Sequence, residues 1–168
     1  MAKIGEALVH GPGPKLRLLP ENVTVAEILA QVPDPQILPH GGGDMILGVE
    51  ESRLGPLLFN TRSESHLYLF GDGKTGKTTF LRSIISEVTR LYTPGEAKIL
   101  AIDMRRSLLG AIPEEYSLRY LTNYAEALKQ LRELAKFLRT RLPGSDVTAE
   151  QIRERTWWSG PEVWVLVG

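Results

Sequence analysis

Cysteine is absent from the 168-residue sequence, and histidine occurs only three times. Without cysteine the chain forms no disulfide and no thiolate metal site, which fits a reducing compartment. The histidines, His10, His40 and His66, do not show the spacing of metal ligands. These absences argue against a disulfide-stabilised secreted domain and against a metal centre built from cysteine or histidine.

The sequence also lacks net charge, because 20 Lys and Arg residues balance 20 Asp and Glu residues. Proteins that wrap nucleic acid need an excess of basic side chains, so we expect no nucleic-acid partner. No apolar run approaches the ~20 residues that a membrane helix requires. The N-terminus has no apolar segment of the kind found in secretory signals, so this segment is predicted to be cytoplasmic.

Residues 1–44 are rich in proline and glycine and are predicted to be a linker with one short helix. The helix is indicated by Thr24 as N-cap with Glu27 three residues later, the pattern of a capping box. Residues 45–168 have a different texture, with fewer prolines and more apolar runs, and are predicted to form a separate folded segment.

In this second segment, short apolar runs alternate with helical patterns. We expect a β-hairpin from residues 45–51 and 56–60, and buried strands at 66–70, 98–103 and 162–167. Helical periodicity follows the strand at 66–70 as far as Leu91, and a further helix begins at the Thr148–Gln151 pair. Strands that alternate with helices predict an α/β fold with a mainly parallel sheet flanked by helices.

A long helix is predicted over residues 123–142, with Asn123 as its N-cap. Its apolar stripe is expected to comprise Tyr124, Leu128, Leu131, Ala135, Leu138 and Leu142. Its other face carries Lys129, Arg132, Lys136, Arg139 and Arg141. That basic face is compatible with a solvated surface, a subunit interface or contact with nucleic acid.

The stretch "GDGKTGKT" matches the phosphate-binding pattern G-x-x-x-x-G-K-[ST] without a mismatch. It lies between an apolar run and an amphipathic helix, where a strand–loop–helix phosphate site requires it. Glycine permits a tight turn whose backbone N–H groups converge on phosphate oxygens, at the positive end of the helix dipole. We therefore expect ATP phosphates to be bound by Gly71, Asp72, Gly73, Lys74, Thr75, Gly76, Lys77, Thr78 and Thr79.

Two of these residues are the candidate catalytic groups. Lys77 is expected to reach between the β- and γ-phosphates, and Thr78 to present its hydroxyl to Mg²⁺. Asp103, at the end of the second buried strand, is either a polar group near the phosphates or a cap for the loop that follows. Arg105 and Arg106 could reach phosphate, contact a neighbouring subunit or form a structural salt bridge.

Four stretches together resemble the FtsK/SpoIIIE-type ATPase domains of the EccC family, the motors of type VII (ESX) secretion. They are "LGVEESRLGPLLFN", "HLYLFGDGKTGKTTFLRSI", "KILAIDMRRSLLGAIPEEY" and "TWWSGPEVWVLV". The resemblance runs from about Arg17 to the end and is greatest to the last of three tandem ATPase domains. It implies a P-loop NTPase fold of the RecA/FtsK-like kind, with residues 45–168 as the N-terminal part of an FtsK/SpoIIIE-type P-loop ATPase domain. The resemblance implies that this domain is incomplete at the C-terminus, because the sequence ends where the Walker B acids should follow Val167.

The resemblance also implies partners: nucleotide with Mg²⁺, other ATPase domains of the same chain, neighbouring subunits, and the C-terminal signal of small WXG-type secretion substrates. It implies a place on the cytoplasmic face of the membrane, anchored through another part of a longer chain. Trp157, Trp158 and Trp164 are either a substrate dock or a buried edge of the core. Two alternative functions stay open, an FtsK-type DNA translocase domain and a non-hydrolysing docking module that nucleotide stabilises.

Overall fold

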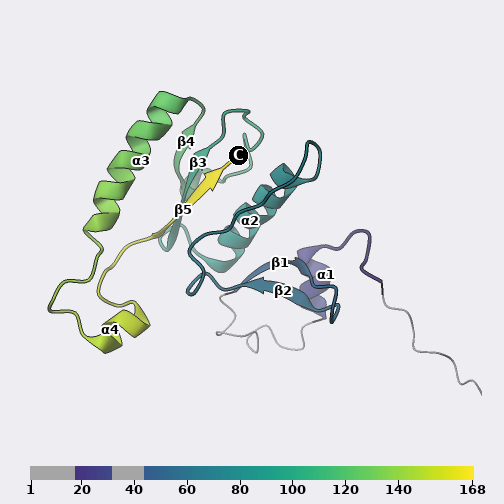
Figure 1. Ribbon diagram of the computed structural model, residues 1–168, viewed down its shortest axis with the longest axis horizontal. Coiled ribbons are helices and arrows are strands. Elements are labelled where there is room, and N and C mark those ends of the chain that lie inside the picture. The colour runs from purple at the N-terminus through teal and green to yellow at the C-terminus, as the bar shows by residue number, and fades with distance from the viewer. Residues whose placement is uncertain (1–17, 32–43) are drawn as a thin grey trace, which may run out of the picture. The chain divides into compact units, whose positions relative to one another are not determined.

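The computed structural model of the protein describes residues 18–31 and 44–168. Its contacts divide the chain into two compact units, Met1–Asn60 and Thr61–Gly168. Most of the linker predicted for residues 1–44 lies outside the described residues. Figure 1 labels the helices and strands of both units.

In the first unit, helix α1 spans Val25–Ala30 and begins with the predicted capping box. The Thr24 hydroxyl accepts a hydrogen bond from the Glu27 amide, and the Glu27 carboxylate accepts one from the Thr24 amide. The predicted hairpin is also confirmed, with antiparallel strands β1 (Met45–Val49) and β2 (Pro56–Phe59).

The second unit is built on a parallel sheet whose described strands run in the order β4-β3-β5. Strand β3 spans Ala97–Ile102 and β5 spans Glu162–Val167, which confirms the strands predicted near residues 98–103 and 162–167. Strand β4, Ser117–Leu121, follows a short 3-10 helix and was not predicted. Its sequence "SLRYL" mixes apolar and polar residues at the edge of the sheet, where strand propensity is a weak guide.

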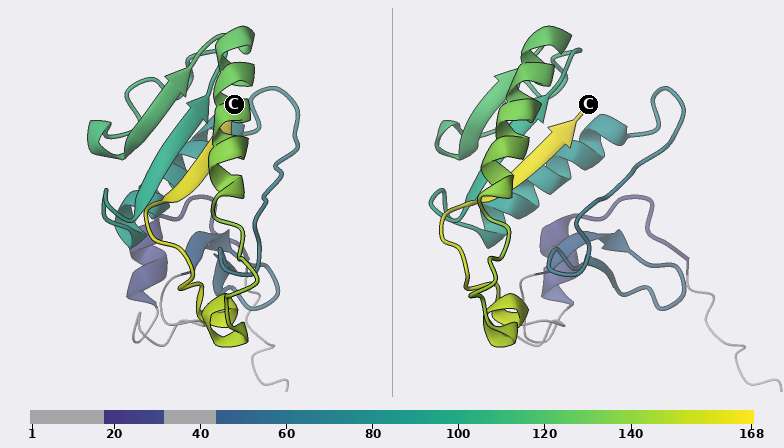
Figure 2. Two further views of the ribbon diagram at one scale, coloured as in Figure 1. Left: turned by 90° about the vertical axis from the view of Figure 1, so that its left-hand side faces the viewer. Right: turned by 60° about the vertical axis from the view of Figure 1, so that its left-hand side comes forward.

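Helices α2 (Lys77–Leu91) and α3 (Tyr124–Arg139) cover opposite faces of this sheet (Figure 2). Both were predicted, and Asn123 caps α3 by accepting a hydrogen bond from the Glu126 amide at 2.9 Å. The short helix α4, Ala149–Glu154, begins at the predicted Thr148–Gln151 capping box. The layered arrangement of sheet and helices confirms the predicted α/β P-loop fold class.

The core on the α3 side of the sheet is formed by residues of β3, β4 and α3. Leu100 and Ile102 of β3 and Leu121 of β4 pack with Ala127, and Leu134 lies partly buried against them. Because side chains of a strand alternate between faces, the intervening residues of β3 point toward the α2 side.

The predicted apolar stripe of α3 is wrong in part. The residues of α3 that enter the core cluster are Ala127 and Leu134, whereas Tyr124 is 75% exposed. Leu142, 69% exposed, lies beyond the end of the helix. The predicted stripe includes bulky Tyr124 as a packing residue and omits Ala127. In the structure the small Ala127 packs against the sheet, so the buried face of the helix is rotated from the predicted one.

The strand predicted at residues 66–70 is not a strand in the structure. Its side chains alternate as in an extended chain, since the His66 and Tyr68 rings stack at 6.5 Å and the Tyr68 and Phe70 rings at 6.4 Å. Phe70 is nevertheless 88% exposed. A strand is defined by ladder hydrogen bonds to a neighbour, and no described strand pairs with this segment.

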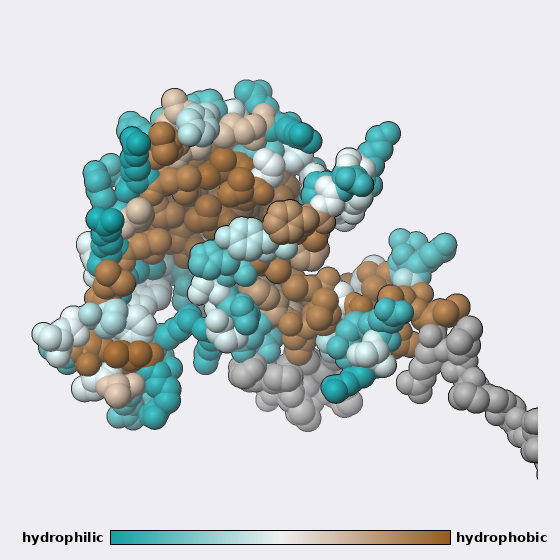
Figure 3. Space-filling model, viewed as in Figure 1, coloured by the Kyte–Doolittle hydropathy of each residue, from teal (hydrophilic) through white to brown (hydrophobic). Residues whose placement is uncertain are grey.

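Strand β5 is hydrogen-bonded to β3 along one side, and no described strand pairs with its other side. On its α3-facing side, Val165 is 39% and Val167 is 66% exposed. Apolar side chains of α3 such as Leu138 are also half exposed. Figure 3 shows the resulting apolar area over the sheet beside α3.

Candidate functional site: the phosphate-binding loop

The glycine-rich loop turns directly into the N-terminus of α2. Gly76 is the N-cap and has φ of 86°, a left-handed conformation that glycine adopts without steric cost. No side chain caps this helix end, so its first-turn amides carry no side-chain hydrogen bond. Unpartnered amides at the positive end of a 15-residue helix are suited to binding an anion.

The start of the loop is held in a tight bend by Thr75. Its hydroxyl donates a hydrogen bond to the Asp72 carbonyl at 2.9 Å. A side chain at Gly71 would bring a Cβ within 2.6 Å of the Thr75 Oγ1, so a larger residue there would displace the Thr75 hydroxyl that holds the bend. A Cβ at Gly73 would meet open space, so packing within the loop does not require glycine at that position.

The Lys77 ammonium folds back over the mouth of the loop. It donates to the Gly71 carbonyl at 2.7 Å and also to the Asp72 carbonyl, and lies 3.4 Å from the Thr75 hydroxyl. These loop residues are exposed to solvent. A phosphate oxygen is a stronger acceptor for an ammonium than a neutral carbonyl is. The Lys77 ammonium is therefore placed to exchange the loop carbonyls for phosphate oxygens.

The Thr78 and Thr79 side chains are exposed at the first turn of α2. The Thr78 hydroxyl is therefore accessible to a cation held by bound phosphates. The uncapped amides, the Lys77 ammonium and the Thr78 hydroxyl together fit the group that the motif predicts, a nucleotide phosphate chain with Mg²⁺.

Asp103 follows β3 at the same carboxyl edge of the sheet, but its side chain is fully engaged. It is 0% exposed and accepts hydrogen bonds from the Leu108 amide at 2.7 Å, the Tyr120 hydroxyl at 2.6 Å and the Ser107 hydroxyl at 3.2 Å. Of the two predicted roles, capping of the following loop is the one that these contacts support.

Burial and hydrogen bonding act together on the Asp103–Tyr120 pair. Burial alone would raise the pKa of the Asp103 carboxyl, but hydrogen bonds from Tyr120, Leu108 and Ser107 outweigh it and hold that pKa below its usual value. Burial, with the hydrogen bond to Asp103, raises the pKa of Tyr120 to about 12. The pair thus favours a charged Asp103 and a protonated Tyr120 over a wide pH range.

We expect Tyr120 to lose its proton only near pH 12, against about 10 for an ordinary tyrosine. Because its folded pKa is raised, its contribution to stability is complete below pH 10 and is lost as the pH rises toward 12. The contribution of Asp103 to stability depends on pH in the opposite direction, since it is lost as the pH falls through the lowered pKa of its carboxyl. Near-ultraviolet phenolate absorbance, with Tyr120→Phe to assign the signal, measures the alkaline titration.

In Asp103→Asn the acceptor of the Tyr120 hydroxyl loses its charge, so the late titration should move back toward the ordinary tyrosine value. A late-titrating tyrosine that persists in Tyr120→Phe would contradict the assignment. So would a Tyr120 titration that Asp103→Asn leaves unchanged.

The loop after β3 is tied to α2 by Arg82, whose guanidinium donates to the Ser107 carbonyl at 2.7 Å. Sequence reasoning missed this link, because the partner is a backbone carbonyl and leaves no sequence signal. Arg105 and Arg106 of the same loop are exposed, and neither forms an ion pair within the described part of the chain. Of the roles considered for them, a structural salt bridge has no support in the described residues.

Two of the tryptophans pack around Arg141 at the C-terminal end of α3. Trp157 donates its indole N–H to the Arg141 carbonyl at 2.6 Å. The Arg141 guanidinium lies 4.6 Å from the centre of the Phe137 ring and 4.1 Å from that of Trp158, and donates to the Pro161 carbonyl. These contacts account for the two tryptophans as part of a packed edge.

Trp164 is separate from this group and lies on β5, where its ring packs against Tyr92 at 6.2 Å between ring centres. Its buried indole N–H has no hydrogen-bond partner among the described residues.

No described helix has the length and apolar character needed to cross a membrane. Nowhere in residues 18–31 and 44–168 do three His, Asp or Glu side chains gather as a metal site.

Comparison with known proteins places these features in a family. The model of the FtsK/SpoIIIE family matches residues 43–158. The ESX-4 secretion system protein EccC4 of Mycobacterium tuberculosis is 34% identical over 154 residues, covering 92% of this chain and 12% of that protein. The ESX secretion system protein EccC of Thermomonospora curvata is 35% identical over 159 residues, covering 94% of this chain and 12% of that protein.

The fold agrees with solved structures of such proteins. A structure of Thermomonospora curvata EccC (ATPases 2 and 3) in complex with a signal sequence peptide matches with a TM-score of 0.77 and 33% identity, covering 94% of this chain and 27% of that one. The chain thus spans only a small part of the relatives that it matches. Together with the family match over residues 43–158, the shared fold shows that this chain belongs to the FtsK/SpoIIIE family.

Proposed function

We propose that this chain binds Mg·ATP through Gly71–Thr79 and serves as a nucleotide-binding domain of a type VII secretion motor. The observation that carries the proposal is the phosphate loop itself. An uncapped helix N-terminus follows a left-handed Gly76, and the Lys77 ammonium lies over the loop at 2.7 Å from the Gly71 carbonyl. This arrangement presents cationic and N–H donors to one small volume.

In the proposed complex, the loop amides and Lys77 hold the phosphates, and the Thr78 hydroxyl takes part in holding Mg²⁺. Bound Mg·ATP would supply a phosphoanhydride bond whose hydrolysis releases the free energy for transport. Asp103 would not serve as a metal ligand here, because its carboxylate already accepts three hydrogen bonds. Its role would be to hold the loop at residues 103–111 beside α2.

The transport role rests on the relatives. The matching proteins are ESX secretion system components, and one solved relative holds a signal sequence peptide. We propose by analogy that the partners are further ATPase domains, neighbouring subunits and the C-terminal signal of a WXG-type substrate, at the cytoplasmic face of the membrane. The relatives named here give no support to the alternative of a DNA translocase.

Calorimetric titration of the chain with Mg·ATP, Mg·ADP and AMP tests the nucleotide site. We expect ATP and ADP to bind at least about tenfold more tightly than AMP, because charge-assisted hydrogen bonds to the β-phosphate contribute about 1.5–3 kcal/mol each. ATP at about a hundred times its Kd should also stabilise the fold by about 2.7 kcal/mol. Equal affinity for AMP and ATP, or no binding of ATP at millimolar concentration, would contradict the proposal.

A further inference from the structure

The outer face of α3 carries a concentration of positive charge on a chain whose formal net charge is +0. Lys129, Arg132, Lys136 and Arg139 recur at intervals of three and four residues and therefore lie along one stripe of the helix. Lys136 pairs with Glu133 at 2.9 Å, and both side chains are exposed. Among the residues that the structure describes, the other three cations form neither an ion pair nor a hydrogen bond.

This stripe faces away from the sheet. The α3 residues of the core cluster, Ala127 and Leu134, are on the opposite side of the helix from Lys129 and Lys136, as the 3.6-residue helical repeat dictates. In Figure 3, hydrophilic side chains line the outer edge of α3 at the left of the view. The charges therefore do nothing for the core, and like charges three and four residues apart destabilise a helix slightly.

The basic side chains border a shallow hollow of about 460 Å³ that only α3 residues line. Its apolar lining residues are Ala125, Leu128 and Ala135, two of which are the smallest side chains that a helix surface offers short of glycine. Small residues let a second backbone approach closely, as in ridges-into-grooves packing of helices. A strip of small apolar residues beside cations is complementary to a helix with apolar and acidic faces.

We propose that the outer face of α3 binds an acidic amphipathic helix of a protein partner. The basic stripe from Lys129 to Arg139 spans about 15 Å at 1.5 Å per residue, which is three turns of a partner helix. Carboxylates on that helix would meet the cations, and its small apolar side chains would cover Leu128 and the two alanines.

Two other anionic partners fit less well. A nucleic-acid backbone would gain nothing from the apolar strip, and the chain has no overall excess of basic residues. An anionic membrane surface is bound by helices with several bulky apolar side chains that insert between lipids, whereas the apolar lining of this hollow is one leucine and two alanines. The protein helix uses both the charges and the small residues.

The probe for the test is a fluorescent 18-residue peptide, designed as an amphipathic helix with glutamates flanking an alanine and leucine stripe, and measured by anisotropy against the whole chain. In Lys129→Glu/Arg132→Glu, we expect about tenfold weaker binding, since each exposed charge contact contributes up to about 1 kcal/mol. The matched control is Arg119→Glu/Arg153→Glu, the same change of charge at exposed positions outside α3. It should bind nearly as well as the unaltered chain.

A lysine version of the peptide should prefer the charge-reversed α3 variant, which a variant that merely unfolded would not show. The proposal is overturned if the acidic peptide does not bind, or if the control loses as much affinity as the α3 variant. It is also overturned if phosphatidylglycerol vesicles or a short DNA duplex bind through the stripe while the peptide does not. ATP affinity should be the same in both variants, so this outcome is independent of the nucleotide site.

Discussion

Replacement of Lys77 by alanine is expected to lower the affinity of the chain for Mg·ATP at least a hundredfold while the fold persists. The ammonium already lies at the phosphate loop, where it bonds to the Gly71 and Asp72 carbonyls. Two charge-assisted hydrogen bonds to phosphate, at about 1.5–3 kcal/mol each, account for a loss of this size. In the absence of nucleotide, Lys77→Ala should lower the stability of the fold only slightly, because both carbonyls belong to exposed residues that water can reach.

Calorimetry gives the affinity, and circular dichroism during heating shows that the fold is retained. Lys74→Asn is the matched control, since it removes one positive charge from the same loop. Asparagine tolerates the left-handed conformation of residue 74, whose φ is 64°. Unchanged ATP affinity in Lys77→Ala would contradict the assignment of the loop as a phosphate site. An equal loss of ATP affinity in Lys74→Asn would mean that the effect comes from the charge of the loop and not from specific contacts of Lys77.

The features that sequence predicted best are those determined by neighbours within a few residues. The capping pairs Thr24–Glu27 and Thr148–Gln151 form as expected, because donor and acceptor lie three residues apart in any helix start. The phosphate loop is similar: Gly76 ends it and α2 begins at Lys77, as the motif requires. Local chemistry suffices for these elements.

Features that depend on distant partners could not be predicted in the same way. The apolar run at residues 66–70 has the composition of a strand, but a strand forms only where another lies alongside. Strand β4 has a weak signal of its own and is formed by pairing with β3. A strand is a property of a pair of segments, and sequence describes one segment at a time.

Asp103 shows the same limit within the site. Its position at the end of a strand pointed to two roles, a polar group near the phosphates or a cap for the loop that follows. The contact that completes its burial comes from Tyr120, 17 residues away on another strand. Nothing in the spacing of these two residues reveals that β3 and β4 are neighbours, so the carboxylate's lowered pKa could not be foreseen.

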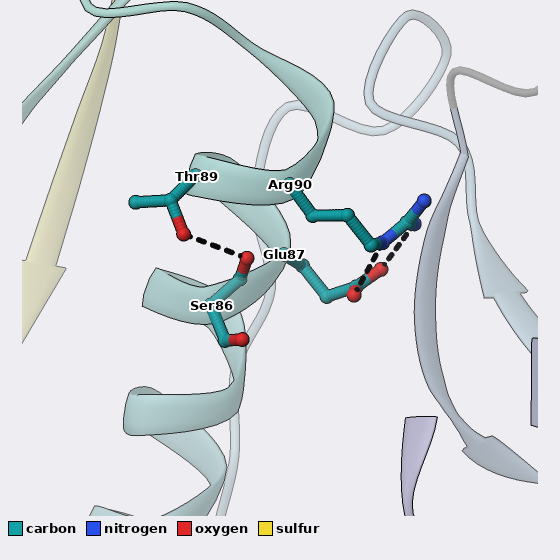
Figure 4. Close-up of polar contacts among 4 residues, drawn as sticks. All are labelled: Ser86, Glu87, Thr89 and Arg90. Atoms are coloured by element: carbon teal, nitrogen blue, oxygen red, sulfur yellow. Dashed lines mark hydrogen bonds and ion pairs between the residues drawn. The ribbon is translucent and has the colours of Figure 1, made fainter. Parts of the chain in front are cut away.

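The second large effect is expected in α2, where Arg90 holds a carboxylate that is almost completely buried. The Glu87 side chain is 1% exposed and accepts two hydrogen bonds from Arg90, at 2.8 and 2.6 Å (Figure 4). Sequence reasoning assigned this position no role, because a glutamate on an amphipathic helix is usually solvated. The hydrogen bonds to Glu87 also raise the pKa of Arg90, so the guanidinium stays charged.

We expect Arg90→Ala to lower the free energy of unfolding by about 3 kcal/mol, measured by urea denaturation and circular dichroism. Removing one member of a buried ion pair typically costs about 3–5 kcal/mol, because the remaining charge is poorly solvated. The lower end applies here, since the Arg90 side chain is 29% exposed and water can partly replace it. Glu87 also keeps an interaction besides the one with Arg90.

Thr89→Ala, on the preceding residue of the same helix, is the matched control. It removes a hydrogen bond from the Thr89 hydroxyl to the Ser86 carbonyl, also drawn in Figure 4, and should cost less than about 1 kcal/mol. The double variant Glu87→Leu/Arg90→Leu should recover most of the loss, because apolar side chains can replace a buried ion pair at little cost. If Arg90→Ala were no less stable than Thr89→Ala, the pair would be a surface contact, and the double variant would then show no recovery.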